Sequence, residues 1–552
     1  CVRFHRYWIA LLEAIQLGAV LWFEYVSHGT LDYYADIIVD NFTLIMILIA
    51  GVIGSLIAVF SLGYMEAFQR EHRDVRDRRS FFFFVLFLFL SAMFGLVVSN
   101  NLLYMYTFWE ITSVCSFLLI GYTESRVAVN NSFKALWMNL LGGAAFAAAI
   151  IVMGLTYHST ALSHLVGLAL AGMPVTVILA LLLLCGFTKS AMMPFSGWLL
   201  GAMVAPTPTS ALLHSSTMVK AGVFLIIKLC PALGNNHAGT MAMFVGGITF
   251  FFASCAAISQ SDGKKVLAYS TISNLGLIVC CAGIGSYEAA WTAIMIVIFH
   301  AVAKSLLFLS VGTAEQQLGS RDIERFDGLF NAMPHLCLCM VIGISGMFLA
   351  PFGMLISKWA AMKAFIDAGH PMLLLLLVFG SATTIFYWAK WLGKILSVMN
   401  GQERREQGIT KGEWFTLKTL SWMTIIVCIL FPLISSYGVL PYLRITYGFT
   451  RDVIAQSNLI IMSLMVVLLV ILPSRYGKGQ PKRKVGALLA GVNTGDDRNY
   501  RGAGDNIIPV ELRNWYMEEW FGEKKMKLSG FALCMACIFI QFAIILGGVY
   551  RG

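Results

Sequence analysis

Long apolar runs, repeated along nearly the whole chain, constrain this sequence more than any other feature. A helix that spans a bilayer needs about 20 apolar residues, and about 15 runs approach that length. They lie at residues 7–26, 42–64, 81–99, 101–121, 133–155, 174–199, 208–229, 239–259, 265–285, 289–312, 334–365, 371–397, 415–436, 453–472 and 531–549. Only 12% of the residues are charged, against about 25% in a soluble domain. Because a helix satisfies its own backbone hydrogen bonds in lipid, the runs predict an all-α polytopic membrane protein with about 15 transmembrane helices.

The loops between the runs alternate in charge, which predicts their sides of the membrane. Lys and Arg gather in loops 69–79, 124–126, 262–265, 319–328 and 400–413, and they are absent from loops 27–41, 156–173, 230–238 and 366–370. By the positive-inside rule, the basic loops and the N-terminus are cytoplasmic. Loop 437–452, with Arg444 and Arg451, departs from the alternation. We therefore attribute the net charge of +10 to topology and not to nucleic-acid binding.

We single out eight ionisable side chains within the apolar runs as lying at mid-membrane depth. They are Glu110, Lys189, His214, Lys220, His300, Lys304, Lys358 and Lys390. Such groups are costly at mid-membrane depth and are functional candidates by default. No arginine falls inside a run. Because arginine keeps its proton in a protein whereas a desolvated lysine can release it, we interpret the set as proton- or ion-transfer residues.

Simpler explanations exist for some of the deep and near-surface cations. Lys228, Lys363 and Lys394 lie near the ends of runs and can extend their amines to the interface. His214 could be a hydrogen-bonded core residue. His214 and His300 could also ligate a haem between helices, although nothing else in the sequence supports a haem pocket.

The cysteines offer no cofactor site. An iron–sulfur cluster typically needs four thiolate ligands, and Cys534-x-x-Cys537 has no second pair beside it. Most of the 12 cysteines lie singly in apolar runs, so we interpret them as small core residues. We expect no redox or metal cofactor in this chain.

Three lysine pairs share nearly one spacing, which predicts an internal repeat. The pairs, 169 or 170 residues apart, are Lys189–Lys358, Lys220–Lys390 and Lys134–Lys304. Two repeats of five helices follow, and because five is odd the second is inverted, as in many transporters. The predicted units are N-terminal helices at 1–80, repeats at 81–229 and 239–397, C-terminal helices at 398–472, a cytoplasmic segment at 473–530 and a last helix at 531–552. Lys134 opens a run and could instead be a topology anchor.

Each predicted repeat contains a signal for a broken helix. Pro194 follows Lys189 by five residues, and Pro351 and Gly353 precede Lys358. Proline removes a backbone hydrogen bond, and an interrupted helix can admit water to a buried lysine. We expect Lys189 to pair with Glu110 of the same predicted repeat and to act with it as a two-state switch.

The polar segment 473–530 is too rich in Gly, Pro and Asn for one long helix. Only 509–527 is predicted to be helical. Trp515, Trp520 and Phe521 suit an interfacial position there. We expect the segment to lie against a partner or the membrane.

Several stretches resemble the antiporter-like proton-pumping subunits of respiratory complex I. They are FWEITSVCSFLLIGY, KSAMMPFSGWLLGAMVAPTPTSALLHSSTMVKAGVFL, DGKKVLAYSTISNLGLIV, HAVAKSLLFLSVG and RDIERFDGL. The same signatures occur in multisubunit sodium/proton antiporters and energy-converting hydrogenases. The resemblance covers roughly residues 40–400. It implies a mid-membrane proton path through Glu110, Lys189, Lys220, His300 and Lys304, with Lys358 and Lys390 in the second half.

The remaining stretches look most similar to the large membrane subunit of Ech-type energy-converting hydrogenases. These are PFGMLISKWAAMKAF, FYWAKWLGKIL and the tail GDDRNYRGAGDNIIPVELRNWYMEEWFGE. This resemblance implies a prokaryotic cell membrane, further membrane subunits, and soluble redox partners that carry iron–sulfur clusters and a NiFe centre. The family commonly has one more N-terminal helix, so we expect a helix to precede this sequence.

We therefore expect an H⁺- or Na⁺-translocating subunit of a ferredoxin-linked, Ech-type hydrogenase complex. The alternative is a subunit of a multisubunit sodium/proton antiporter driven only by gradients, or of a complex I-like NADH/quinone oxidoreductase. The absence of visible cofactor ligands disfavours a chain that is itself a redox enzyme. Nickel and iron–sulfur proteins should accompany this chain only in the hydrogenase.

Overall fold

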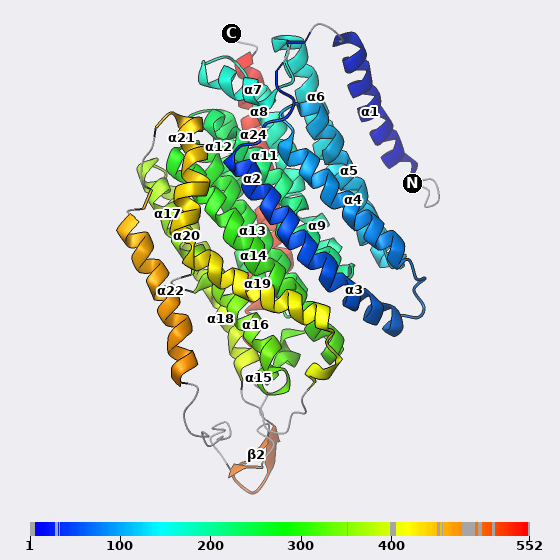
Figure 1. The fold of residues 1–552 in the computed structure, drawn as a ribbon, viewed down its shortest axis with the longest axis vertical. Helices are drawn as coiled ribbons and strands as arrows, with labels where there is room; N and C mark the ends of the chain where they lie inside the picture. The colour runs from blue at the N-terminus through cyan, green and yellow to red at the C-terminus, as the bar shows by residue number, and fades with distance from the viewer. Residues whose placement is uncertain are drawn as a thin grey trace.

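Helical rods packed side by side form the body of the protein, with a small sheet below them (Figure 1). The computed structural model describes residues 6–27, 31–32, 34–349, 352–397, 405–449, 453–454, 456–476, 492–494, 499–509 and 514–549. Most helices are apolar around their whole circumference, as expected where lipid or protein covers every face. The prediction of an all-α polytopic membrane protein is confirmed.

The helices have the following bounds. The N-terminal part contains α1 (Tyr7–Ser27), α2 (Asn41–Leu48), α3 (Gly54–Glu71), α4 (Arg79–Val98), α5 (Leu102–Ile120), α6 (Arg126–Tyr157), α7 (Leu162–Leu170), α8 (Thr176–Lys189), α9 (Gly197–Gly201), α10 (Thr207–Ala211) and α11 (Met218–Leu233). The central part contains α12 (His237–Ile258), α13 (Gly263–Ile284), α14 (Tyr287–Leu318), α15 (Leu329–Ala332), α16 (Pro334–Phe348), α17 (Gly353–Asp367) and α18 (Pro371–Leu396). The C-terminal part contains α19 (Lys411–Ile429), α20 (Phe431–Leu433), α21 (Leu440–Tyr447), α22 (Gln456–Tyr476), α23 (Glu518–Phe521) and α24 (Glu523–Val549). Short π-helical segments η2 (Ile49–Ile53), η4 (Leu212–Ser216) and η7 (Ile434–Val439) join neighbouring helices, and 3₁₀ turns lie at η3 (Ala202–Val204), η5 (Ile323–Phe326) and η6 (Glu406–Gly408).

The number of continuous spans is smaller than the sequence suggested. Within the described residues, twelve helical stretches are long and apolar enough to cross a membrane. The pair Lys411–Ile429 and Phe431–Tyr447, bent by 64°, makes a thirteenth. Of the other two predicted runs, 174–199 contains the shorter apolar helix Thr176–Lys189, and 453–472 lies largely on α22. The run 174–199 fails as one span because its helix stops at Lys189.

Polar residues in the loops determine where many helices begin. The side chains of the cap residues accept a hydrogen bond from a backbone N–H of the first turn, which has no partner within the helix. The capping residues are Asp40, Asn101, Ser125, Asn236, Asp262, Ser286 and Thr410. The helix starts are therefore set by local chemistry, and the apolar runs follow from them.

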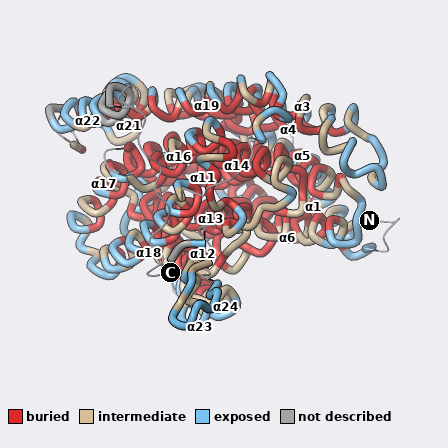
Figure 2. Tube along the Cα trace, turned by 90° about the horizontal axis from the view of Figure 1, so that it is seen from below, coloured by how far each residue is buried: buried red, intermediate tan, exposed pale blue. Residues whose placement is uncertain are grey.

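Helices α12, α13 and α14 form the buried centre of the array, as the view from below shows (Figure 2). Helices α12 and α13 approach each other at two glycines. A Cβ atom on Gly246 would lie 2.6 Å from the carbonyl oxygen of Gly276, and one on Gly276 would lie 2.7 Å from that of Gly246. Small residues allow this close backbone packing between membrane helices. It fixes α13 beside α14, which carries two of the site candidates.

Both predicted repeats contain an interrupted helix. In the first, α8 ends at Lys189 and helix resumes with α9 after a stretch that contains Pro194. In the second, α16 ends at Phe348 and α17 begins at Gly353, shortly before Lys358. Pro351 lies outside the described residues. The long helices α6 and α14 occupy the same place in the two predicted units and both have 32 residues. The inverted relation of the two units stays a prediction.

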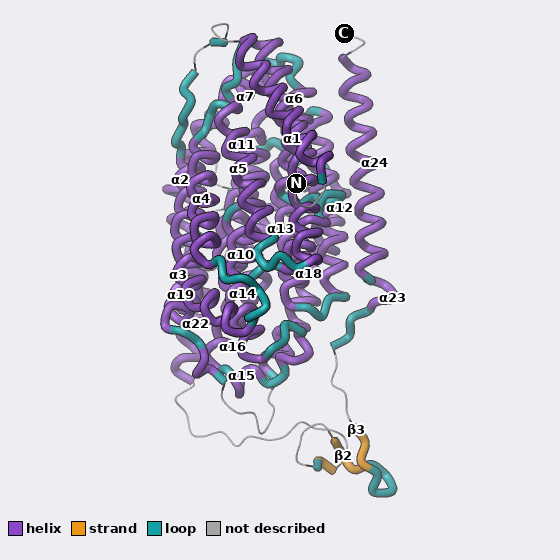
Figure 3. The backbone as a smooth tube through the Cα atoms, turned by 90° about the vertical axis from the view of Figure 1, so that its right-hand side faces the viewer, coloured by secondary structure: helices purple, strands orange, loops and turns teal. Residues whose placement is uncertain are grey.

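A small antiparallel sheet precedes the last helix, and the sequence did not predict it. Its strands are β1 (Val492–Asn493), β2 (Asn499–Arg501) and β3 (Ile507–Pro509), in the order β1-β2-β3. The predicted helix at 509–527 is wrong in its first part, because Pro509 ends β3 and residues 514–517 are not helical. Helix α24 begins before the predicted residue 531 and packs on α12 at the edge of the array (Figure 3). The basic stretch at 477–491 lies outside the described residues.

Tertiary contacts at Glu324 explain why the stretch before α23 is extended. The N–H of Asn514 and the hydroxyl of Tyr516 donate to its carboxylate at 3.2 and 2.5 Å, and Lys394 lies at 2.7 Å. Burial tends to raise the pKa of Glu324, but the hydrogen bonds from Lys394, Tyr516 and the Asn514 N–H hold it below its ordinary value. Lys394 also pairs with Asp327 at 3.0 Å. The amine of Lys394, expected to extend to the interface, is buried against two carboxylates of the loop there.

Candidate functional site

Most of the predicted site residues lie deep inside the helix array. The relative exposure is 0% for Lys189, His214, Lys220, His300 and Lys304, 7% for Lys358 and 9% for Glu110. Buried charges in proteins are normally paired or functional. The contacts of each group therefore indicate what it can do.

Lys189 reaches the helix that carries Glu110, but the two do not form the expected direct pair. The Nζ atom of Lys189 donates to the carbonyl oxygen of Trp109 at 2.9 Å and to the Ser113 hydroxyl at 2.7 Å. It also lies 5.0 Å from the centre of the Trp109 ring. Neither carboxylate oxygen of Glu110 has a hydrogen-bond partner in the described part of the chain. Lys189 thus occupies the turn of α5 on which Glu110 sits and contacts its neighbours instead.

Lys220 and His300 form a direct pair between α11 and α14. The Nζ atom of Lys220 lies 2.7 Å from Nδ1 of His300. A charged lysine has only donors, so the imidazole nitrogen must accept when the lysine is protonated. The two nitrogen atoms can therefore share a proton. Such an arrangement can pass a proton on without a large movement of either side chain.

Lys304 lies one turn after His300 on α14. Its amine donates to the carbonyl oxygen of Leu267 in α13 at 2.9 Å and lies 5.2 Å from the centre of the Trp388 ring. The adjacent Ser305 hydroxyl donates to Ser215 in η4 at 2.7 Å. The amine thus depends on a backbone carbonyl and an aromatic face.

His214 lies within the π-helical segment η4. Its ring packs between those of Trp198 and Phe308, at centroid distances of 6.1 and 5.9 Å. Neither ring nitrogen has a hydrogen-bond partner in the described structure. Single π-helical turns frequently occur at functional sites. The prediction that His214 could be a hydrogen-bonded core residue is therefore not met.

The two candidates of the second half lie in different surroundings. The amine of Lys358 lies 5.6 Å from the centre of the Phe250 ring. The amine of Lys390 donates to the carbonyl oxygen of Ile258 at 2.5 Å and lies 3.9 Å from the centre of the Tyr516 ring. Because Ile258 ends α12, Lys390 lies at the end of a span, next to the C-terminal segment.

Of the lysines expected to extend to the interface, two form buried contacts. Lys228 pairs with Asp40 beside the start of α2, as Lys394 does with Glu324 and Asp327. Lys363 remains partly exposed and lies 3.9 Å from Asp367. Lys134 packs against Gly197 of α9, where an added Cβ would lie 2.9 Å from its amine. Lys134 therefore faces the broken helix of its own predicted repeat.

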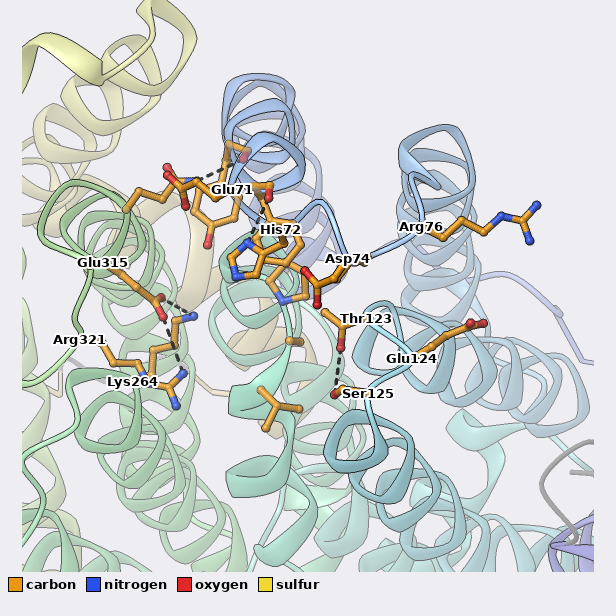
Figure 4. Close-up of a pocket in the computed structure, with 18 residues that line it drawn as sticks. Glu71, His72, Asp74, Arg76, Thr123, Glu124, Ser125, Lys264, Glu315 and Arg321 are labelled. Carbon is orange, nitrogen blue, oxygen red and sulfur yellow. Dashed lines mark hydrogen bonds and ion pairs between the residues drawn. The ribbon is translucent and has the colours of Figure 1, made fainter.

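A polar cavity of about 820 Å³ opens on the face that carries the basic loops (Figure 4). Lys264 pairs there with Glu315 at 2.8 Å, and Arg321 lies 3.9 Å from the same carboxylate. The inner wall includes Tyr64, whose hydroxyl donates to Thr207 at 3.1 Å. Thr207 begins α10, which leads into η4 and His214. The cavity thus connects this face with the start of the broken span.

The acidic residues of the first apolar run, Glu13 and Glu24, escaped the sequence reasoning. Glu13 lies in the first apolar run and is half-buried on α1. Its charge acts on both Tyr106 and Glu110 of α5. The signal was the one that identified Glu110, a carboxylate within an apolar run.

Two family comparisons match the chain. The family described as NADH:quinone oxidoreductase/Mrp antiporter, TM, matches residues 99–384. The family described as NADH-Ubiquinone oxidoreductase (complex I), chain 5 N-terminus, matches residues 22–82. The first match covers more than half of the chain and includes the candidate residues from Glu110 to Lys358.

The curated relatives point to the same family. The Na(+)/H(+) antiporter subunit A1 of Staphylococcus haemolyticus (strain JCSC1435) is 33% identical over 386 residues, which cover 66% of this chain and 47% of that protein. The subunit A1 of Staphylococcus aureus (strain N315) is 32% identical over 429 residues, which cover 73% of this chain and 52% of that protein. The chain therefore spans about half the length of these relatives.

Solved structures share the fold. A chain of the Mrp complex from Dietzia sp. DQ12-45-1b is similar with a TM-score of 0.67 and 26% identity, over 84% of this chain and 53% of that chain. A chain of the membrane-bound sulfane sulfur reductase, an archaeal respiratory membrane complex, has a TM-score of 0.66 and 20% identity, over 83% and 92%. The second likeness is one of fold alone. Together with the family match over residues 99–384, these findings show that the chain belongs to the NADH:quinone oxidoreductase/Mrp antiporter family of transmembrane proteins.

Proposed function

We propose that this chain is an ion-translocating subunit of a multisubunit sodium/proton antiporter complex. Its cargo is a monovalent cation, H⁺ or Na⁺. The curated relatives described above are antiporter subunits, which favours this alternative over an Ech-type hydrogenase. The hydrogenase interpretation rested on the C-terminal stretches, and the comparisons give it no support.

The observation that carries the proposal is the Lys220–His300 pair, with Lys304 one turn away. All three side chains are fully buried, and the pair is 2.7 Å apart. Membrane-embedded lysine and histidine are costly to keep, yet both can exchange protons, unlike arginine. A fully buried pair that can share a proton suits ion transfer better than it suits structural support.

The comparison with bacterial antiporter subunits supports the partners and the membrane location, and the loop charges support the orientation. We infer further membrane subunits around this chain, in a prokaryotic cell membrane, with the basic loops on the cytoplasmic side. The second candidate function is a redox-driven pump of a respiratory complex, which the fold likeness over 92% of the sulfane sulfur reductase chain favours. Soluble redox partners with iron–sulfur clusters, and a NiFe centre in the hydrogenase form, belong only to that candidate.

The test uses the complex purified through a tag on this chain and reconstituted into liposomes that enclose a pH-sensitive dye. A sodium gradient is imposed without any electron donor. We expect protons to move in the direction opposite to the sodium ions. We expect Lys304→Ala to lower the rate of this proton movement at least tenfold. Lys418→Ala is the matched control, because Lys418 is exposed on α19 beside Trp414 and should leave the rate unchanged.

The alternative has a different signature in the same liposomes. A redox-driven pump would move protons only after an electron donor is added, and the purified complex would contain nickel or iron–sulfur clusters. Proton movement that ignores the sodium gradient in the intact complex would overturn the antiporter proposal.

A further inference from the structure

Helix α1 lies at the edge of the array (Figure 1) and packs on α6. A Cβ atom on Gly143 of α6 would lie 2.3 Å from Oε1 of Glu110 and 2.9 Å from Oε1 of Gln16 on α1. The missing side chain of Gly143 therefore makes room for these two polar groups. The Gln16 amide is fixed because its Nε2 donates to the carbonyl oxygen of Leu140 at 2.8 Å.

The buried oxygens in this space are unpartnered. Gln16 is 4% exposed, and within the described residues its Oε1 and both oxygens of Glu110 have no hydrogen-bond partner. Oε1 of Gln16 and an ionised Glu110 are both acceptors, so they cannot hydrogen-bond to each other, and the donor that acts on the Glu110 carboxylate is the Ser113 hydroxyl. A protonated Glu110 can donate to Oε1 of Gln16. The geometry therefore suits a carboxyl group that takes up a proton.

Glu13 adds a second carboxylate to this place. It lies one turn before Gln16 on the same face of α1, since residues three apart on a helix are neighbours. Its charge acts on Glu110 and on Tyr106. Two carboxylates that share a poorly hydrated site cannot both be ionised at low cost. They therefore tend to hold one proton between them.

A cavity of about 640 Å³ leads toward this pair from the face that lacks basic loops. Among the described residues, its lining includes the acids Glu24, Asp32 and Asp36 and no Lys, Arg or His. On α5 it is lined by Tyr106 and Thr107, which lie one turn before Glu110. On α1 its lining runs from Ser27 to Leu17, the residue next to Gln16. An acidic passage of this kind attracts protons and repels anions.

We propose that Glu13 is the second carboxylate of the Glu110 site and that the cavity between α1 and α5 is its proton port. This inference rests on the proposed function. A proton from the cavity binds to Glu13, and it then passes to Glu110, which leaves Glu13 ionised and ready for the next proton. Gln16 positions the transferred proton by accepting it as a hydrogen bond from Glu110. From Glu110 the proton reaches the turn of α5 that Lys189 contacts.

The first experiment tests Glu13 in the reconstituted complex. Glu13→Gln keeps the size of the side chain and removes its proton exchange, so proton flux should fall at least tenfold, and Glu13→Asp should retain part of it. Glu66→Gln changes an exposed acid on α3 that pairs with Arg70, and it should leave the flux unchanged. Equal assembly of all variants, judged by size-exclusion chromatography, keeps the comparison valid.

The second experiment tests the port without measuring transport. A cysteine at Thr107, in the cavity wall, should react with a membrane-impermeant maleimide added on the face without basic loops. A cysteine at Val114, exposed on the same helix outside the cavity lining, should not react. The parent chain supplies the background, because its described cysteines are buried or half-buried.

The outcomes separate the two levels of inference. Wild-type flux in Glu13→Gln would overturn the role of Glu13, and an unreactive cysteine at Thr107 would overturn the port. A wild-type complex that moves no protons would contradict the proposed function, while labelling at Thr107 would still decide whether water reaches the Glu110 site.

Discussion

Replacing His300 with leucine removes the group that Lys220 contacts at 2.7 Å. Leucine has a similar width and keeps the helix packing. The amine of Lys220 makes no other hydrogen bond among the described residues that would replace it. A fully buried ammonium group is thereby left without its acceptor, and we expect it to remain neutral for most of the time. The reconstituted complex should then carry few protons through this step.

The size of the effect follows from the lost contact. A hydrogen bond to a charged group contributes about 1.5–3 kcal/mol. Because about 1.36 kcal/mol corresponds to a tenfold change in an equilibrium, the protonated form of Lys220 should become about 10–150 times rarer. Proton flux driven by a sodium gradient should fall by a similar factor if this step limits the rate.

Two further variants distinguish the roles of His300. His300→Gln supplies an acceptor but cannot exchange a proton, so it should restore the stability of the complex toward heat without restoring the flux. His158→Asn is the matched control, because His158 is exposed and has a positive φ of 49°, which asparagine tolerates. Flux in His300→Leu within twofold of the wild-type value would refute the reasoning. Full flux in His300→Gln would reduce His300 to a structural acceptor.

Three further predictions concern other parts of the chain. Lys358→Ala and Lys358→Arg should both strongly reduce ion uptake in the assembled complex, the latter because arginine holds its proton. The control Lys363→Ala, on the same helix, should not reduce uptake. Normal uptake by the Lys358→Arg variant would show that Lys358 does not transfer protons. Cysteines engineered into loop 69–79 should react with a thiol reagent on the cytoplasmic side and those in loop 156–165 should not, and the reverse pattern would overturn the orientation. Because the pKa of Glu324 is held below its ordinary value of 4.5, its contacts with the C-terminal segment should persist above that pH and weaken as the pH falls through the lowered pKa; equal hydrogen-exchange protection of the segment at pH 7 and 3, after correction for intrinsic rates, would contradict this.

The spans could be predicted because the backbone of an apolar run in lipid has to satisfy its own hydrogen bonds. An apolar run of about 20 residues has to form a helix there, so run length alone identified nearly every span. Continuity could not be predicted from run length. The run 174–199 has the right length, yet its helix stops at Lys189 and resumes at Gly197. Pro194 signalled an interruption, but the place where a helix ends depends on packing around it.

The C-terminal segment failed for a different reason. The stretch NWYMEEWFGE has aromatic and acidic residues at spacings that suit an interfacial helix. In the structure, Asn514 and Tyr516 bind Glu324, which lies on the loop after α14. A contact between residues about 190 positions apart leaves no pattern in the local sequence. The tertiary contact therefore outweighs the local helix propensity of this stretch.

The partner of Lys189 shows the same limit inside the membrane. Sequence reasoning identified both Lys189 and Glu110 and brought them to neighbouring helices. Opposite charges suggested that they touch. The structure instead brings the amine to a carbonyl oxygen and a hydroxyl on the same turn. Both are neutral acceptors that stabilise the ammonium, while the charge of Glu110 acts on Lys189 without a direct contact. A direct ion pair would couple the two groups more tightly than a relay needs.

The case of Glu13 shows what a residue-by-residue rule can find and what it cannot. A carboxylate in the first apolar run carries the same signal as Glu110, so an even application of the rule would have included it. The rule could not have shown that the two belong to one site, because Glu13 and Glu110 lie on different helices that α6 brings together. Gly143 makes this possible, since any side chain there would meet Glu110 and Gln16. Gly143→Ala should therefore separate the two carboxylates without removing either, and proton flux should fall although every titratable group is retained. Unchanged flux in this variant would mean that Glu110 works without the space that Gly143 provides.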